Sequence, residues 1–175
     1  RIALAIGLLG MATTSHAMPE RTSYRATVIT RFDSKQIQVL KEVGLADVQT
    51  GRPVTADDPV RVASISKLVT ALGVMRLVET KKLDLDADIS RYLGWRLRNP
   101  NFPNRKITLR LLLSHQSSLM DGGDLYVIPL GETLRARLGD PRVWDATHPA
   151  GGYFRYANIN YPVIGSIIER VTGQR

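Results

Sequence analysis

The stretch Val62-Ala-Ser-Ile-Ser-Lys-Leu68 opens a segment that is patterned as a helix and carries a serine and a lysine three positions apart. Apolar residues then recur at intervals of three or four, at Leu68, Ala71, Leu72, Met75 and Val78. This spacing predicts an amphipathic helix over Ser64 to Thr80. Because positions i and i+3 share one face of a helix, we expect the Ser64 hydroxyl and the Lys67 amine to meet.

The pair Ser64 and Lys67 has the composition of a nucleophile beside a base. A serine hydroxyl is a weak nucleophile that needs a neighbouring base, and a lysine held away from water can serve as one. The start of a helix adds the positive end of a dipole, and the Ser64 backbone N–H can face a developing oxyanion. On its own, the same spacing also fits a helix cap followed by a surface lysine.

A second polar pair, in Tyr156-Ala-Asn158, precedes an apolar helical segment near the end of the sequence. Residues two apart lie on the same side of an extended segment. The Tyr156 phenol could then pass a proton between Ser64, Lys67 and a leaving group, and the Asn158 amide could bind a substrate amide. Taken alone, the pair also fits a loop tyrosine beside a capping asparagine.

The other elements follow from local signals. Tyr24 to Phe32 and Ile37 to Val43 are strand candidates joined by turn residues, which predicts a hairpin, and Gly51 to Pro59 has the composition of a loop. The predicted helices are a short one within 84–93 capped by Asp86 or Asp88, one from Leu109 capped by Thr108, one over 130–138, and one over 161–171 closed by Gly173. Strands come before helices, which favours an α+β or mixed class.

The two polar pairs belong to a series of motifs that occur in a fixed order along the sequence. In chain order they are Gly44–Asp47, Thr50–Thr55, Arg61–Lys67, Val78–Asp86, Ile107–Leu119, Pro149–Asn158 and Gly165–Gly173. As a set in this order, from about Ala26 to the end, they resemble the serine β-lactamase-related hydrolases: class C β-lactamases, D-alanyl-D-alanine carboxypeptidases, and related esterases and amide hydrolases.

The resemblance implies a fold, a site and a reaction. The implied fold is α+β, an antiparallel sheet flanked by a helical domain with the site between them. Ser64 would accept the acyl group, Lys67 would be its base partner, Tyr156 the second proton-transfer residue and Asn158 a substrate contact. The implied reaction is acyl transfer to Ser64 and hydrolysis of the acyl-enzyme without a cofactor. The implied substrate is a small molecule or a peptide, and a β-lactam, a D-Ala-D-Ala peptide, an ester and an amide would all suit such a centre.

The sequence departs from the family pattern in two places. Ser118 stands where the family block usually has Gly, and a positive φ there would cost about 1 kcal/mol. The family's third motif, Lys-Thr-Gly or His-x-Gly on an edge strand, does not occur in this sequence. Val171-Thr-Gly173 looks similar, but we predict that it ends a helix rather than lying on a strand. We therefore expect the chain to be truncated on its C-terminal side, without the last strands, and to turn over slowly by itself. The alternative is a non-catalytic ligand-binding or pseudo-enzyme module of the same fold.

The amino-acid composition excludes several kinds of site and partner. The sequence has 175 residues, 24 Lys+Arg against 16 Asp+Glu and a net charge of +8, with no cysteine, which excludes a cysteine nucleophile, a disulfide scaffold and a thiolate zinc site. The charge is spread along the chain without a basic-aromatic patch, so we expect no nucleic acid partner. No pair among His16, His115 and His148 has metal-ligand helical spacing, so we predict no metal site, and by resemblance His115 is a structural residue near the site.

The N-terminal segment has the pattern of a secretory signal. Arg1 precedes an apolar run from Ile2 to Ala12, and small residues stand at Ser15 and Ala17. The run is shorter than the roughly 20 residues that a membrane-spanning helix needs, so we predict no stable membrane span. We expect cleavage after Ala17, an exported product in the periplasm or outside the cell, and a hydrolase domain over 18–175.

Overall fold

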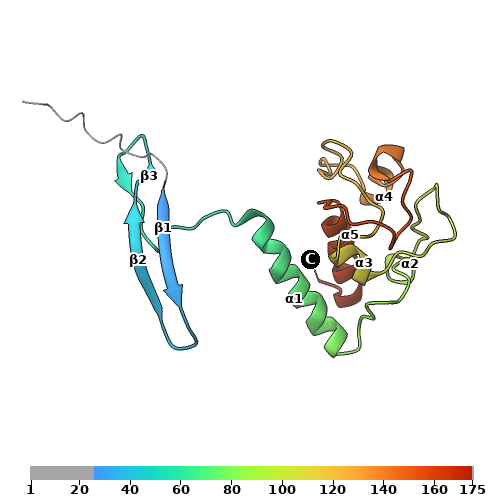
Figure 1. The fold of residues 1–175 in the computed structure, drawn as a ribbon, viewed down its shortest axis with the longest axis horizontal. Coiled ribbons are helices and arrows are strands. Elements are labelled where there is room, and N and C mark those ends of the chain that lie inside the picture. The colour runs from blue at the N-terminus through green and yellow to red at the C-terminus, as the bar shows by residue number, and fades with distance from the viewer. Residues whose placement is uncertain (1–25, 175) are drawn as a thin grey trace, which may run out of the picture. The chain divides into compact units, whose positions relative to one another are not determined.

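The computed structural model describes residues 26–174, and the predicted signal segment 1–17 lies outside them. The chain forms two compact units, one up to Arg61 and one from Val62 (Figure 1). The first is built of short antiparallel sheets and the second is mainly helical, so the mixed α+β class is confirmed. No helix in 26–174 is long and apolar enough to cross a membrane.

The first unit contains the predicted hairpin. Strands β1 (Thr27–Phe32) and β2 (Ile37–Val43) pair antiparallel. The Asp33 carboxylate accepts the backbone N–H groups of Lys35 and Gln36 at 2.8 and 2.9 Å, which closes the turn between them. A second small sheet joins β3 (Leu45–Asp47) to β4 (Arg52–Pro53), so the segment predicted to be loop contains one short strand.

The second unit carries the predicted helices in order, together with two short 3-10 helices that the sequence analysis did not predict. They are the 3-10 helix η1 (Ala63–Ile65), α1 (Ser66–Glu79), α2 (Ser90–Leu93), α3 (Leu109–Leu113), α4 (Leu134–Arg137), the 3-10 helix η2 (Pro141–Val143) and α5 (Asn160–Thr172). Helix α5 lies at the centre of the core and packs against α2 and α3. Its buried side chains recur at helical spacing, at Asn160, Val163, Ile164 and Ile167.

The predicted caps explain where several helices begin and end. The Thr108 hydroxyl accepts the Leu111 N–H at the start of α3, and Gly173 ends α5 in a left-handed conformation, both as predicted. The N-cap position of α2 is Ile89 rather than the predicted Asp86 or Asp88, although the Asp88 carboxylate accepts the Ser90 N–H at 3.0 Å. The helix predicted over 130–138 is reduced to α4, because Gly131 has a φ of 88° and the chain is helical only after the cap at Thr133.

Helix α1 differs from its prediction at its start. Ala63 has a positive φ of 43°, and the chain makes the 3-10 turn η1, which contains Ser64, before the α-helix starts at Ser66.

The predicted apolar face of α1 is only partly buried, although Val78 packs against the core. Leu68 and Leu72 are 62% and 61% exposed, whereas Val74 is fully buried. Apolar side chains occupy most of the helix circumference, so spacing alone did not identify the face that packs on the core.

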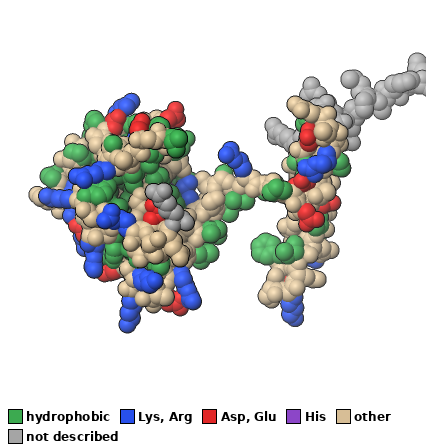
Figure 2. All heavy atoms as spheres, turned by 180° about the vertical axis from the view of Figure 1, so that it is seen from behind, with side chains coloured by type: hydrophobic (Ala, Val, Ile, Leu, Met, Phe, Trp, Pro, Cys, Tyr) green, Lys and Arg blue, Asp and Glu red, His purple; other side chains and the backbone are tan. Residues whose placement is uncertain are grey.

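Charged side chains are scattered over the second unit. Figure 2 shows Lys and Arg side chains over its visible face, interspersed with acidic ones rather than gathered in one patch. Several form ion pairs, such as Arg98 with Asp88 and Arg137 with Glu132.

Candidate active site

The structure brings the four predicted site residues together. Ser64 Oγ lies 3.1 Å from Lys67 Nζ and 2.7 Å from the Tyr156 hydroxyl. Lys67 Nζ also donates to Asn158 Oδ1 at 2.8 Å. The two predicted pairs therefore form one hydrogen-bonded cluster, although Ser64 and Tyr156 are 92 positions apart in the sequence.

Local geometry positions the first pair. Ser64 lies in η1 and Lys67 in the first turn of α1, so the i, i+3 spacing holds across the junction of the two helices. The Lys67 amine is 5.0 Å from the ring centroid of Tyr156 and 5.1 Å from that of Tyr161, which adds cation–π attraction. The amine is thereby directed towards Ser64 and Asn158.

Tyr156 is the most exposed of the tyrosines in this cluster, at 46%. Its interaction with Lys67, and then its hydrogen bond with Ser64, lower the pKa of the phenol from its ordinary value. Tyr161 shows the opposite behaviour, because burial raises the pKa of its phenol. Of the two, Tyr156 is thus the phenol that more readily gives up its proton.

Asp121 belongs to the site, although the sequence analysis did not identify it. Its carboxylate accepts the Asn158 side-chain amide at 2.8 Å and the Ile159 backbone N–H at 3.1 Å. Asp121 stands before two glycines, a pattern typical of a turn, so nothing local distinguished it from a turn residue. The Asp121 carboxylate orients Asn158 towards Lys67.

His115 lies directly against the cluster. Its ring stacks on that of Tyr156 with 4.5 Å between centroids, and its Nδ1 accepts the Ala157 backbone N–H at 3.1 Å. Burial, and then the charge of Lys67, lower the pKa of His115, while Asp121 opposes them. The imidazole is therefore neutral near pH 7.

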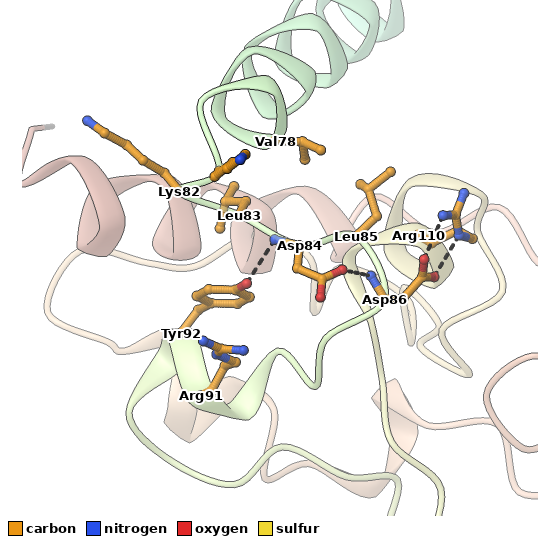
Figure 3. A pocket seen from close by; sticks show the side chains of 10 residues that line it. Val78, Lys82, Leu83, Asp84, Leu85, Asp86, Arg91, Tyr92 and Arg110 are labelled. Atoms are coloured by element: carbon orange, nitrogen blue, oxygen red, sulfur yellow. Dashed lines mark hydrogen bonds and ion pairs between the residues drawn. The ribbon is translucent and has the colours of Figure 1, made fainter.

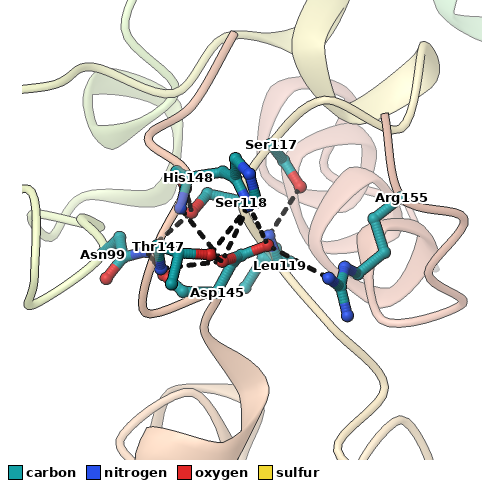
Figure 4. A network of polar contacts seen from close by, with 8 residues as sticks. All are labelled: Asn99, Ser117, Ser118, Leu119, Asp145, Thr147, His148 and Arg155. Atoms are coloured by element: carbon teal, nitrogen blue, oxygen red, sulfur yellow. Dashed lines mark hydrogen bonds and ion pairs between the residues drawn. The ribbon is translucent and has the colours of Figure 1, made fainter. Parts of the chain in front are cut away.

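A network of polar contacts extends to Arg155, the residue before Tyr156 (Figure 4). Ser118 has a φ of 70°, the positive value considered from the sequence. Its hydroxyl compensates for this conformation, because it accepts from the Asn99 amide and donates to the His148 carbonyl, both at 2.6 Å.

Asp145 is the charged centre of that network. Burial acts to raise the pKa of its carboxyl, but hydrogen bonds from Thr147 and His148 outweigh burial and hold the pKa well below its ordinary value. Arg155, the residue before Tyr156, pairs with the same carboxylate at 3.4 Å. The network therefore anchors the chain next to the phenol.

A separate pocket of about 430 Å³ lies beyond the C-terminal end of α1 (Figure 3). Leu83, Asp84 and Tyr92 line part of it, and the Tyr92 hydroxyl accepts the Asp84 backbone N–H at 2.9 Å. It contains none of the four predicted site residues. In the part of the chain that the structure describes, no group of three His, Asp or Glu side chains could hold a metal ion.

Comparison with known proteins places this geometry in context. Residues 16–175 match the family model described as Beta-lactamase. Esterase EstB of Burkholderia gladioli is 34% identical over 149 residues, which cover 75% of this chain and 37% of the esterase.

Two solved structures show the same fold. A penicillin-binding protein from Bacillus halodurans is 27% identical with a TM-score of 0.64 over 84% of this chain and 45% of its own. FmtA from Staphylococcus aureus matches in fold, with a TM-score of 0.70 at 24% identity, over 87% of this chain and 41% of its own. The chain thus spans less than half the length of each of these three relatives.

Proposed function

The chain belongs to the beta-lactamase family, and from this premise we propose that the protein is a serine hydrolase in which Ser64 accepts the acyl group. The observation that carries the proposal is the three-way contact of Ser64 Oγ with Lys67 Nζ and the Tyr156 hydroxyl, at 3.1 and 2.7 Å. A nucleophile within hydrogen-bond reach of its proton acceptors is the arrangement that acyl transfer needs.

In the proposed acylation step, Ser64 Oγ attacks the carbonyl carbon of the substrate. The hydroxyl proton passes to the pair formed by Tyr156 and Lys67, which we treat as one coupled acceptor because both groups touch Oγ. The tetrahedral intermediate then collapses, the bond from the carbonyl carbon to the leaving group breaks, and the leaving group takes the proton. The products of this step are the Ser64 acyl ester and the free amine or alcohol.

In the proposed deacylation step, water takes the place of Ser64 as the nucleophile. Water attacks the acyl carbon and gives a proton to the Tyr156–Lys67 pair. The bond to Ser64 Oγ breaks, Oγ takes the proton back, and the carboxylic acid leaves. The lowered pKa of Tyr156 favours this role, because a pKa closer to neutral leaves more of the residue in the phenolate form that accepts a proton.

For the substrate, we propose an ester as the first candidate, since EstB, by its name an esterase, is 34% identical to this chain. Amides, β-lactams and D-Ala-D-Ala peptides have the same reactive carbonyl. A hydrolysis panel of a short acyl ester, nitrocefin and a D-Ala-D-Ala peptide separates them. Fastest hydrolysis of the ester supports the proposal, and a clear preference for either of the others overturns it.

The reaction itself is tested by covalent labelling of the protein, expressed at its natural length, with a fluorescent fluorophosphonate. Ser64→Ala should abolish the label. Ser66→Ala is the matched control, because Ser66 is an exposed serine two positions away in α1, and it should label normally. Labelling that persists in Ser64→Ala would contradict the proposal, and reversible ligand binding without any label would favour the non-catalytic module.

We also propose export, with segment 1–17 as a cleaved signal. The supporting pattern is the basic start, the apolar run and the small residues up to Ala17. N-terminal sequencing of protein recovered outside the cytoplasm should begin at Met18. Recovery of uncleaved protein in the cytoplasm alone would refute it.

A further inference from the structure

His115 holds the backbone on both sides of Tyr156. Its carbonyl oxygen accepts the Arg155 N–H at 2.8 Å, and its Nδ1 accepts the Ala157 N–H at 3.1 Å. Between these two contacts its ring stacks on the Tyr156 ring, with 4.5 Å between centroids and 27° between planes. One residue therefore fixes the main chain before and after Tyr156 and the plane of its side chain.

The backbone of His115 is shaped for these contacts. The residue follows α3 and has a φ of 56°, a left-handed conformation in which His is found more often than most residues. Its own N–H bonds to the Leu112 carbonyl at 3.2 Å, which ties it to the helix. Helix α3 thus fixes the orientation of His115, and His115 in turn fixes the orientation of Tyr156.

The hydrogen bonds also determine the protonation state that this arrangement needs. The Ser117 hydroxyl donates to Asn160 Oδ1 at 2.6 Å, which leaves the Asn160 NH₂ facing His115 Nδ1 at 3.1 Å. Two donors, from Ala157 and Asn160, therefore point at the same nitrogen. Nδ1 can accept only if it carries no proton, so the hydrogen of the neutral ring is on Nε2.

The groups around the ring oppose its protonation. Lys67 of α1 is a cation next to it, the rings of Tyr156 and Tyr161 pack against it, and Asp121 is the acidic group that acts in the other direction. A proton on Nδ1 would point at the two N–H donors, so the hydrogen bond from the Ala157 N–H would be lost. Ionisation of this ring and placement of Tyr156 are therefore coupled.

We propose that neutral His115 is the positioning residue of Tyr156, and that its protonation releases the phenol from Ser64 and switches off acyl transfer at acid pH. The proposal deepens the proposed function and rests on it for the effect on rate. The placement of Tyr156 by His115 is a separate claim about the unreacted protein. It can therefore be tested without turnover.

Two variants separate the hydrogen bond from the stacking. His115→Asn keeps an acceptor close to the position of Nδ1 and tolerates a left-handed backbone, but it cannot be protonated. His115→Phe keeps a ring and loses the acceptor. The probe is a fluorophosphonate, whose rate of reaction with Ser64 is followed from pH 4 to 9.

We expect the rate at which wild-type Ser64 is labelled to fall at a pH below 6.5, the ordinary pKa of a histidine side chain, because the pKa of His115 is lowered. His115→Asn should label at neutral pH within about tenfold of wild type and lose the acid decline, while His115→Phe should label about 10²-fold more slowly at every pH, as displacement of a reacting group by about 1 Å does. With a chromogenic ester the loss should appear in kcat rather than KM. An unchanged acid decline in His115→Asn, or wild-type rates in His115→Phe, would overturn the proposal.

The second measurement does not depend on activity. In wild-type protein with ¹³C-labelled tyrosine, the resonance of Tyr156, assigned through Tyr156→Phe, should shift as His115 titrates. If this shift is seen but Ser64 is never labelled, the positioning role stands and the proposed function fails. If the Tyr156 resonance does not respond to the His115 titration, the positioning role is wrong whatever the activity.

Discussion

The Asp121 carboxylate binds the amide nitrogen of Asn158 at 2.8 Å and thereby determines which end of that amide faces Lys67. An asparagine amide has one donor and one acceptor end, so an acidic partner for Nδ2 leaves Oδ1 free to accept from the Lys67 amine at 2.8 Å. A residue that looks like part of a turn thus orients a residue of the site.

Replacing this carboxylate should weaken both the site and the fold. In Asp121→Asn the new amide can present its NH₂ group to Asn158, so the Asn158 amide loses its fixed orientation. We expect the Ser64 labelling rate to fall about tenfold and the free energy of unfolding to fall by about 1–3 kcal/mol, the usual effect of losing a hydrogen bond to a charged group. Asp124→Asn, at an exposed position nearby, is the control. Equal rates in the two variants would show that Asp121 does not orient the site.

The phenol oxygen of Tyr156 can be tested in a similar way. Tyr156→Phe removes the group 2.7 Å from Ser64 Oγ and leaves the ring stacked on His115. If this oxygen transfers the proton, acylation should slow by about 10²–10⁴-fold with little change in melting temperature. Tyr153→Phe is the matched control, since Tyr153 is an exposed tyrosine of the same loop that stacks on His148. A loss below about threefold in Tyr156→Phe would mean that Lys67 acts without it.

Ser118 combines an unfavourable backbone conformation with two compensating hydrogen bonds. Ser118→Ala keeps the Cβ at a φ of 70° and removes the contacts with Asn99 and His148, so we expect a loss of about 1–3 kcal/mol in the free energy of unfolding. Ser118→Gly removes the same contacts and relieves the backbone, so it should be less damaging by about 1 kcal/mol. Urea denaturation of the two variants checks the order, and an alanine variant more stable than the glycine variant would contradict it.

The buried carboxylate of Asp145 should make stability depend on acid. Its folded pKa lies below the ordinary value of 3.8, so its contribution is fully present above about pH 4–5 and is lost as the pH falls below that range. Asp145→Asn should lower the free energy of unfolding at pH 7 by about 1–3 kcal/mol. The wild-type and variant curves should begin to approach each other as the pH falls below about 4, and the remaining difference should be lost only at still lower pH, near the folded pKa.

The measurement is chemical denaturation from pH 7 to pH 3. Asp57→Asn, which changes an exposed carboxylate in the first unit, should leave the pH dependence unaltered. A constant difference between wild type and Asp145→Asn over this range would show that the carboxylate is not ionised preferentially in the folded state.

Local rules account for what the sequence predicted correctly. The hairpin, the Thr108 cap and the left-handed Gly173 each depend on residues within a few positions of one another. The pairing of Ser64 with Lys67 also depends only on a short interval along the chain. Such features are predictable because the backbone geometry of a turn or helix sets these contacts wherever the element lies.

The sequence by itself determined the two polar pairs and the family to which they point. Only the tertiary structure decided that Ser64 meets Tyr156 across 92 positions, that Val74 rather than Leu68 faces the core, and that Asp121 and His115 hold the site in place. The reason is that side-chain spacing specifies which residues share a face of one element, whereas the partner of that face depends on how the elements pack together.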